Sequence, residues 1–214
     1  MTSTDALIRD LSVDLAPVRR RSPRREVGAL LALGAAELAL LLMAGLMRPD
    51  LGRVLSSPFM IWKIGSLVLL AGVSCTVAMR SFAPPAPSRR SLMLLLGLAV
   101  LTVIGGALVT SAAESGRPLI ERLSPAHGLV CAASIVVLAS PLVALLAALM
   151  RRAAPVHPGR SALTTGLAAS TCGALLFAVC CPANDPLYVV VWYSVAVAAV
   201  TAAARWLLPR RFRL

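Results

Sequence analysis

The chain has 214 residues, of which 58% are hydrophobic and 14% are charged, and its mean hydropathy is +0.84. Hydropathy this high over such a length excludes a soluble protein and indicates an integral membrane protein. The formal net charge of +12 would also suit a nucleic-acid-binding protein, but the basic residues are scattered over several segments, so we expect no direct nucleic-acid contact.

The first 26 residues form a polar tail in which the sequence predicts one short amphipathic helix, ended by Pro17. Its apolar stripe holds Leu7, Ile8, Leu11 and Leu15. Helices that lie on a membrane usually carry Lys and Arg on the polar face, whereas residues 1–15 hold three Asp and one Arg, a balance that anionic lipid would repel. We therefore expect this helix to dock in a groove of a basic partner protein, with packing on the protein's own loops as the alternative.

Six apolar stretches follow, at residues 27–47, 59–79, 91–111, 128–150, 161–180 and 187–208. An α-helix rises about 1.5 Å per residue, so about 20 residues cross the ~30 Å hydrocarbon layer. The sequence therefore predicts an all-α, polytopic membrane domain of six transmembrane helices over residues 27–208. The tail, residues 1–26, precedes this domain, and a basic C-terminus, residues 209–214, follows it.

The basic residues orient these six spans. Sixteen of the 21 lie in the tail, in the loops after the second and fourth spans, and near the C-terminus, whereas five belong to the other side. Positive residues near the ends of spans stay in the cytoplasm. We therefore predict that both termini are cytoplasmic. The use of one lysine against 20 arginines and the richness in Ala, Leu and Val favour a bacterial gene, and hence a place in the lipid bilayer of a bacterial inner membrane.

Two charged residues fall inside the first two spans. Glu37, near the middle of the first, predicts either a proton or ion site or a neutral carboxyl that is hydrogen-bonded to a neighbouring helix. We favour the second interpretation, because no other acid or partnering Arg lies at the same depth. Lys63, near the outer end of the second span, is expected to extend outward to the interface beside Trp62.

The five cysteines divide by predicted depth. Cys131, Cys180 and Cys181 lie at the outer ends of the fourth and fifth spans, whereas Cys75 and Cys172 lie deeper, and Cys75 is expected to be an apolar core residue. The periplasm is oxidising, so the outer thiols are candidates for a disulfide. Cys131 and Cys181 with His127 would also form a soft metal site, and buried small residues without a function are the alternative. No catalytic motif is present, so we expect neither an enzyme nor a resident cofactor.

Four segments, by their order and spacing, resemble the NrsF family of six-span bacterial membrane anti-sigma factors, named as negative regulators of sigma F. They are Asp5-Ala6-Leu7-Ile8 with Leu11, Asp14, Pro17 and Val18; Arg48-Pro49-Asp50-Leu51 with Pro58-Phe59 and Trp62-Lys63; Cys131 and Pro141 with Arg151-Arg152-Ala153-Ala154-Pro155; and Cys181-Pro182-Ala183-Asn184-Asp185-Pro186 before Trp192-Tyr193. Cys180 departs from the family pattern, which has a single cysteine before that proline.

The resemblance implies a membrane anti-sigma factor. It would hold an extracytoplasmic-function sigma factor at the membrane through its tail and release it when a signal reaches the periplasmic cysteines. The residues expected to bind the sigma factor are Asp5, Leu7, Ile8, Leu11, Asp14, Pro17 and Val18. The expected sensor cysteines are Cys131 and Cys181, with Cys180 as a substitute for Cys181.

Both oxidation and a thiophilic metal ion, bound by Cys131 and Cys181, stay open as the signal, and the sequence specifies no oligomeric state. A small transporter or channel and a membrane thiol oxidoreductase are the alternative functions. The first would need a polar path through the spans, and the second a CxxC pair, for which the adjacent Cys180 and Cys181 are a strained replacement.

Overall fold

The computed structural model describes residue 4 and residues 22–82, 89–111, 122–153 and 155–210, and every regular element in these residues is an α-helix. The helices are α2 (Pro23–Met43), α3 (Leu51–Val54), α4 (Pro58–Ser81), α5 (Arg89–Ser111), α7 (Pro125–Ala153), α8 (Pro158–Ala178) and α9 (Pro186–Arg210). The seven tail residues that we expect to bind a partner lie outside the described residues, so the tail helix stays a prediction.

Prolines mark where the long helices begin. Five of the six start at a proline, namely Pro23, Pro58, Pro125, Pro158 and Pro186. Proline suits the first turn, because the N–H that it lacks would have no helical partner there and its fixed φ is already helical. The prolines between the apolar stretches therefore place the helix starts within a few residues of the starts of the predicted spans.

The end of α2 is set by a glycine. Gly45 has φ +66°, and its N–H donates to the Leu42 carbonyl at 3.1 Å, while the Leu46 N–H donates to the Leu41 carbonyl at 3.2 Å. These two bonds form a Schellman motif, in which a left-handed glycine closes a helix. As a result α2 ends at Met43, four residues before the predicted end at 47. It also starts four residues before the predicted span, at Pro23, whereas α9 continues to Arg210, past the predicted boundary at 208.

Five of the long helices, α2, α4, α7, α8 and α9, are long and apolar enough to cross a membrane. In α5 the apolar stretch is the shorter segment Met93–Gly106. The chain is thus consistent with a helical membrane protein. A sixth crossing by α5, and the orientation of the spans, stay predictions.

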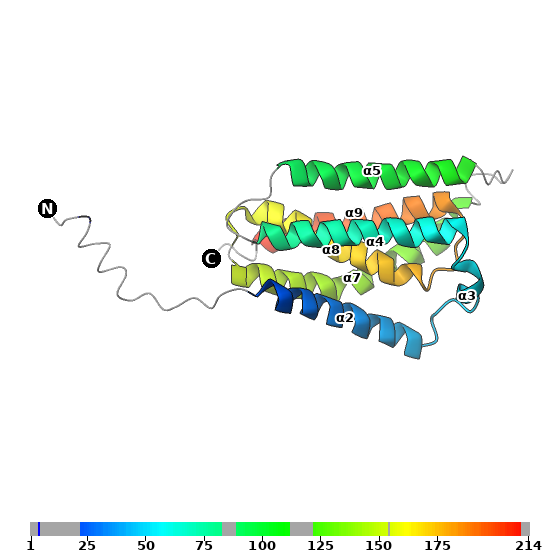
Figure 1. Cartoon of the computed structure of the whole chain (residues 1–214), viewed down its shortest axis with the longest axis horizontal. Helices are drawn as coiled ribbons and strands as arrows, with labels where there is room; N and C mark the ends of the chain where they lie inside the picture. The colour runs from blue at the N-terminus through cyan, green and yellow to red at the C-terminus, as the bar shows by residue number, and fades with distance from the viewer. Residues whose placement is uncertain (1–3, 5–21, 83–88, 112–121, 154, 211–214) are drawn as a thin grey trace.

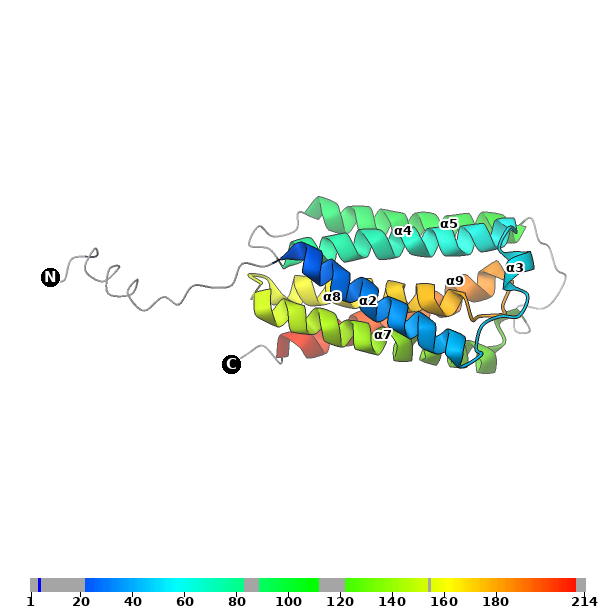
Figure 2. The same cartoon turned by 60° about the horizontal axis from the view of Figure 1, so that its bottom comes forward.

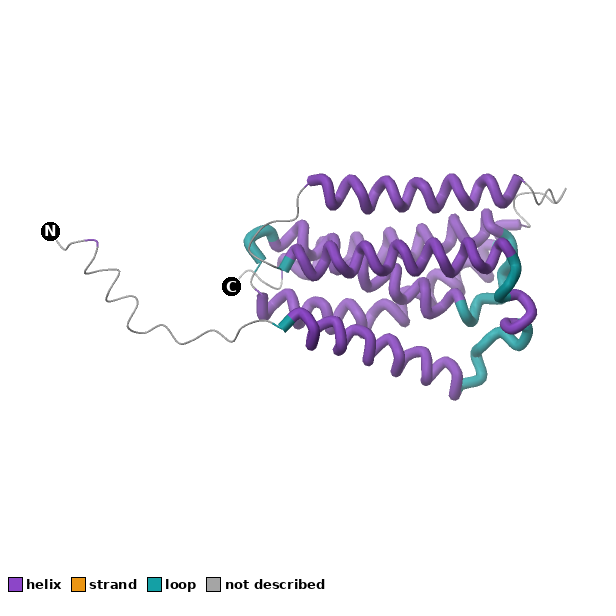
Figure 3. The backbone as a smooth tube through the Cα atoms, viewed as in Figure 1, coloured by secondary structure: helices purple, strands orange, loops and turns teal. Residues whose placement is uncertain are grey.

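The long helices lie side by side, each running opposite to the one before it, and the described connections lie at the ends of the bundle (Figures 1, 2 and 3). We call the end that holds α3 the α3 end. Helix α8 lies at the centre, where α4, α7 and α9 pack against it, and it is the most buried of the five candidate spans. Helix α5 packs on α4 and α9, whereas α2 packs on α7 and α8 with little of its surface buried.

Small and hydroxyl-bearing residues let α8 take this central place. A Cβ atom on Gly173 would lie 2.9 Å from the backbone nitrogen of Ala139 on α7, so only glycine permits this approach. On the other side, the Ser74 and Thr171 hydroxyls are hydrogen-bonded at 2.9 Å between α4 and α8. Membrane helices commonly associate through such small residues and interhelical hydrogen bonds.

Candidate functional site

Two thiols meet at the α3 end of the bundle. Cys131 lies on the second turn of α7, and Cys181 lies in the segment between α8 and α9. Their Sγ atoms are 3.9 Å apart, both residues are buried, and both thiols are free. The structure therefore brings together the two cysteines that the sequence could place only at a similar depth.

The surroundings of the two thiols distinguish Cys181 from its neighbour Cys180. The hydrogen bond with the Cys131 thiol lowers the pKa of Cys181 to about 5, and the Lys63 ammonium acts in the same direction against the effect of burial. Burial raises the pKa of Cys180. The Tyr188 hydroxyl donates to the Cys131 Sγ at 3.3 Å. Cys181 is therefore the more readily ionised of the adjacent pair.

Lys63 lies inside the bundle rather than at an interface. Its side chain is 1% exposed, and its Nζ lies 5.5 Å from the centre of the Tyr193 ring on α9. Among the described residues, this Nζ has no hydrogen-bond partner. The prediction that Lys63 extends outward was wrong, because an aromatic face and an acidic thiol lie inward of α4 and both favour a cation.

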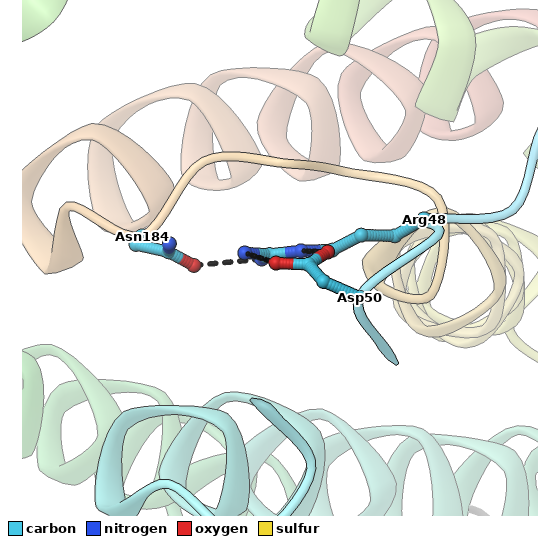
Figure 4. Close-up of polar contacts among 3 residues, drawn as sticks. All are labelled: Arg48, Asp50 and Asn184. Carbon is cyan, nitrogen blue, oxygen red and sulfur yellow. Dashed lines mark hydrogen bonds and ion pairs between the residues drawn. The ribbon is translucent and has the colours of Figure 1, made fainter. Parts of the chain in front are cut away.

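Polar contacts fix the segment that carries Cys181. Arg48, in the loop after α2, forms an ion pair with Asp50 and donates through Nη1 to the Asn184 Oδ1 at 2.7 Å (Figure 4). The hydrogen bond between Arg48 and Asp50 raises the pKa of the arginine and lowers that of the carboxyl. Arg48 is buried, so this contact ties the α2–α4 connection to the Cys181 segment.

A second ion pair ties the same segment to the residues before α7. Arg122 donates through Nε and Nη2 to the two carboxylate oxygens of Asp185, at 2.8 and 2.9 Å. Asp185 also accepts from the Leu187 N–H at 2.9 Å, in the first turn of α9. Burial alone would raise the pKa of Asp185, but the bonds from Arg122 and Leu187 outweigh it, so this pKa lies below its usual value.

A cavity of about 920 Å³ lies beside the thiol pair, and Cys131, Cys180, Cys181, Tyr188 and His127 are among its lining residues. The His127 Nδ1 is hydrogen-bonded to Ser124 Oγ at 2.9 Å. Within the described residues, no group of three or more His, Cys, Asp and Glu side chains is placed to hold a metal ion. The expected site of two cysteines and a histidine is therefore not assembled in this structure.

Two buried features were missed or misread from the sequence. The Sγ atoms of Cys75 and Cys172 lie 3.5 Å apart, a contact that was not predicted from their deeper positions in the second and fifth spans. Glu37 is 7% exposed, and neither of its carboxylate oxygens has a hydrogen-bond partner among the described residues. The expectation that a neighbouring helix hydrogen-bonds Glu37 was therefore wrong.

The sequence of the chain was compared with known protein families and matches one of them. The model of the NrsF family, described as "Negative regulator of sigma F", matches residues 11–214. The chain belongs to the NrsF family. Its NrsF match includes Leu11, Asp14, Pro17 and Val18 of the tail, whereas Asp5, Leu7 and Ile8 precede it.

A curated NrsF protein of Caulobacter vibrioides (strain NA1000 / CB15N), named anti-sigma-F factor NrsF, is 29% identical to this chain over 216 residues. The alignment covers 96% of the chain and 98% of that relative. No solved structure matches the chain. The NrsF family is one of regulators, which agrees with the expectation from the resemblance.

Proposed function

We propose that this NrsF-family protein is a membrane anti-sigma factor that holds an extracytoplasmic-function sigma factor at the bacterial inner membrane and releases it in response to chemistry at Cys131 and Cys181. The observation that carries the regulatory part is the family match over residues 11–214. The observation that supports the sensing part is the 3.9 Å separation of two buried free thiols.

In this proposal α5 is the sixth span, and both termini are cytoplasmic. The distribution of arginine supports this topology, since Arg80 lies in the last turn of α4, Arg151 and Arg152 in the last turn of α7, and Arg210 in the last turn of α9. These turns lie at the end of the bundle opposite α3 (Figure 1). Under the positive-inside rule that end is cytoplasmic, so the thiol pair at the α3 end would face the periplasm.

The thiol separation suits two signals. A disulfide needs about 2.05 Å between the sulfurs, which is a short movement from 3.9 Å. Two Zn–S bonds of about 2.3 Å at a tetrahedral angle would place the sulfurs ~3.8 Å apart. The observed spacing therefore fits an edge of a metal site closely, and we favour a thiophilic metal ion, with oxidation as the second signal.

Free energies also favour a metal ion over oxidation as the signal. Inverting a two-state equilibrium from 1:99 to 99:1 needs about 5.5 kcal/mol. One disulfide typically contributes about 2–4 kcal/mol, whereas a structural zinc site contributes about 10 kcal/mol or more. A metal bound by both thiolates, with further ligands from solvent, would contribute only part of the free energy of a full structural site, but about 5.5 kcal/mol of it would already invert the equilibrium.

The tail is the proposed contact with the sigma factor, and its substitution tests the function. In the full-length protein, Leu7→Ala with Leu11→Ala should release the sigma factor, because each buried leucine contributes about 1.5–3 kcal/mol, which predicts at least a hundredfold weaker binding. The matched control is Val13→Ala, which lies on the opposite side of the predicted helix. Co-purification of the sigma factor and expression of its target genes are the measurements.

Equal target-gene expression in the double variant and in the Val13→Ala control would contradict the role of the tail. The sensing part is tested separately with Cys131→Ser and Cys181→Ser. Each should leave the target genes unresponsive to cadmium or diamide, while Cys180→Ser keeps the response, because the Cys131 thiol is hydrogen-bonded to Cys181 and burial raises the pKa of Cys180. A normal response without Cys131, Cys180 and Cys181 would refute the sensing part and leave the tail result standing.

A further inference from the structure

A second pair of thiols lies inside the bundle, away from the α3 end. Cys75 on α4 and Cys172 on α8 are both free and partly buried, and their Sγ atoms are 3.5 Å apart. The neighbouring residues, Ser74 and Thr171, are hydrogen-bonded at 2.9 Å and fix the two helices against each other at this level. The short distance is therefore held by the packing of α4 on α8.

The pair is accessible from the side of the bundle. Cys75 and Cys172 both line a cavity of about 610 Å³ whose walls come from α2, α4, α7 and α8. Leu31 on α2 and Val68 on α4 line the same cavity and are 68% and 49% exposed, so the cavity opens between these two helices. In a membrane, this opening faces lipid.

The lining selects the chemistry that can reach the pair. Apart from the two thiols, the polar members of the lining are Thr76 and Arg80, and the other lining residues are apolar. Moving a charged reagent into such surroundings is costly, whereas an uncharged one enters readily. A cavity of this size also falls within the range of about 300–1,000 Å³ that small-molecule sites occupy.

The geometry favours a disulfide over a metal ion. Two Zn–S bonds of about 2.3 Å would hold the sulfurs ~3.8 Å apart in a tetrahedral site and ~4.6 Å apart in a linear one. The observed 3.5 Å is shorter than both.

We propose that Cys75 and Cys172 are a redox site for an uncharged, membrane-soluble two-electron oxidant, such as a quinone, that enters between α2 and α4. The two thiols lose two electrons and two protons to the oxidant, and one S–S bond forms between α4 and α8. A quinone that accepts them leaves as the hydroquinone. This reaction does not depend on whether the protein binds a sigma factor.

Two disulfide reagents of opposite character test the site. The full-length protein carrying Cys131→Ser, Cys180→Ser and Cys181→Ser, in lipid nanodiscs, is treated with uncharged 2,2′-dithiodipyridine. One thiol breaks the reagent's S–S bond and releases one thiopyridone with its proton; the other then displaces the second thiopyridone. We expect two thiopyridones per protein, no retained adduct, and a protein lighter by two hydrogen atoms. With the dianionic 5,5′-dithiobis(2-nitrobenzoate), the reaction should be slower by at least about tenfold.

The matched control adds Cys172→Ser, and the lone Cys75 should then release one thiopyridone and keep the other as an adduct. If the triple variant does not fold, peptide mapping of the oxidised wild-type protein replaces it and should find the Cys75–Cys172 cross-link. Two retained adducts, or disulfides between two copies of the protein, would overturn the pairing. Equal rates with the charged and uncharged reagents would overturn access through the apolar cavity.

Discussion

Replacing Lys63 with methionine tests the origin of the acidity of Cys181. Methionine has a similar length, so it fills the space beside Tyr193 but carries no charge. The pKa of Cys181, about 5 in the wild type, is lowered by the bond with Cys131 and then by the Lys63 ammonium. An opposite charge within about 4–6 Å typically shifts a pKa by about one to three pH units. We therefore expect the pKa of Cys181 to rise in Lys63→Met towards the usual thiol value of about 8.5, while the bond with Cys131 keeps it below that value.

The same substitution should make the folded protein less stable at neutral pH. The Lys63 ammonium is 1% exposed and has no hydrogen-bond partner among the described residues, so its effect on Cys181 is through charge. Removing one partner of a buried charge pair typically costs about 3–5 kcal/mol, because the other charge is left unpaired. A loss of stability that shrinks as the pH falls through the pKa of Cys181 would mark Lys63 as the partner of the Cys181 thiolate.

The assay follows alkylation of Cys181 against pH by peptide mass spectrometry, in full-length protein that lacks Cys75, Cys172 and Cys180. At pH 6, about one unit above the wild-type pKa, most of Cys181 is thiolate, and this fraction should fall clearly in Lys63→Met. Arg53→Met is the matched control, since Arg53 lies exposed on α3 at the same end of the bundle. An unchanged pKa in Lys63→Met, or an equal rise in Arg53→Met, would refute the pairing of Lys63 with Cys181.

Two further predictions concern the segments around the thiol pair. Asp185→Asn removes the ion pair with Arg122, whose side chains are 27% and 15% exposed, and should lower the free energy of unfolding by about 1.5–3 kcal/mol. Folding lowers the pKa of Asp185, so the difference in free energy of unfolding between the wild type and Asp185→Asn should be largest above the usual carboxyl pKa of about 4. It should vanish as the pH falls through the lowered pKa, and thermal unfolding measured against pH would show this. Gly128→Val should cost at least about 1–3 kcal/mol in the same assay, because a Cβ atom there would lie 1.9 Å from the Trp192 ring. Gly97→Val, with nothing near its Cβ, is the control, and equal losses would contradict the close contact.

The helices could be predicted from the sequence because hydropathy and proline act locally. A run of apolar residues after a proline sets both the type and the start of an element, and α4, α7, α8 and α9 all follow this rule. The end of α2 was placed four residues too late, because apolar residues continue beyond Gly45, and hydropathy does not register a left-handed glycine. The short helix α3 gave no apolar signal at all.

The rotation of each helix about its axis was harder to predict, because these helices are apolar on every side. Depth alone put Cys131, Cys180 and Cys181 at one level, but the rotation and the turn after α8 decide which thiol points inward. The same uncertainty produced the wrong outward placement of Lys63.

A signal for the inner pair did exist in the sequence. The stretches 59–79 and 161–180 each contain a hydroxyl residue followed by a cysteine, Ser74-Cys75 and Thr171-Cys172. A second hydroxyl contact joins Ser81 on α4 to Thr164 on α8. Relative to the contact between Ser74 and Thr171, it lies seven residues later on α4 and seven residues earlier on α8. Seven residues are two turns, so matched polar positions at this spacing indicate one antiparallel interface.

Helix α8 connects the two proposed thiol sites. Cys172 lies on α8 and faces α4, and Cys181 follows its last turn and faces α7, so the two pairs act on different neighbours of one central helix. Effects at well-separated sites usually add, so two disulfides of about 2–4 kcal/mol each would together contribute about 4–8 kcal/mol. That range includes the about 5.5 kcal/mol needed to invert a two-state equilibrium, which a single disulfide does not reach. Under both proposals, and without a bound metal ion, one disulfide at either pair would shift the equilibrium only in part. Two disulfides that favour the same state would be needed to switch the protein fully by oxidation.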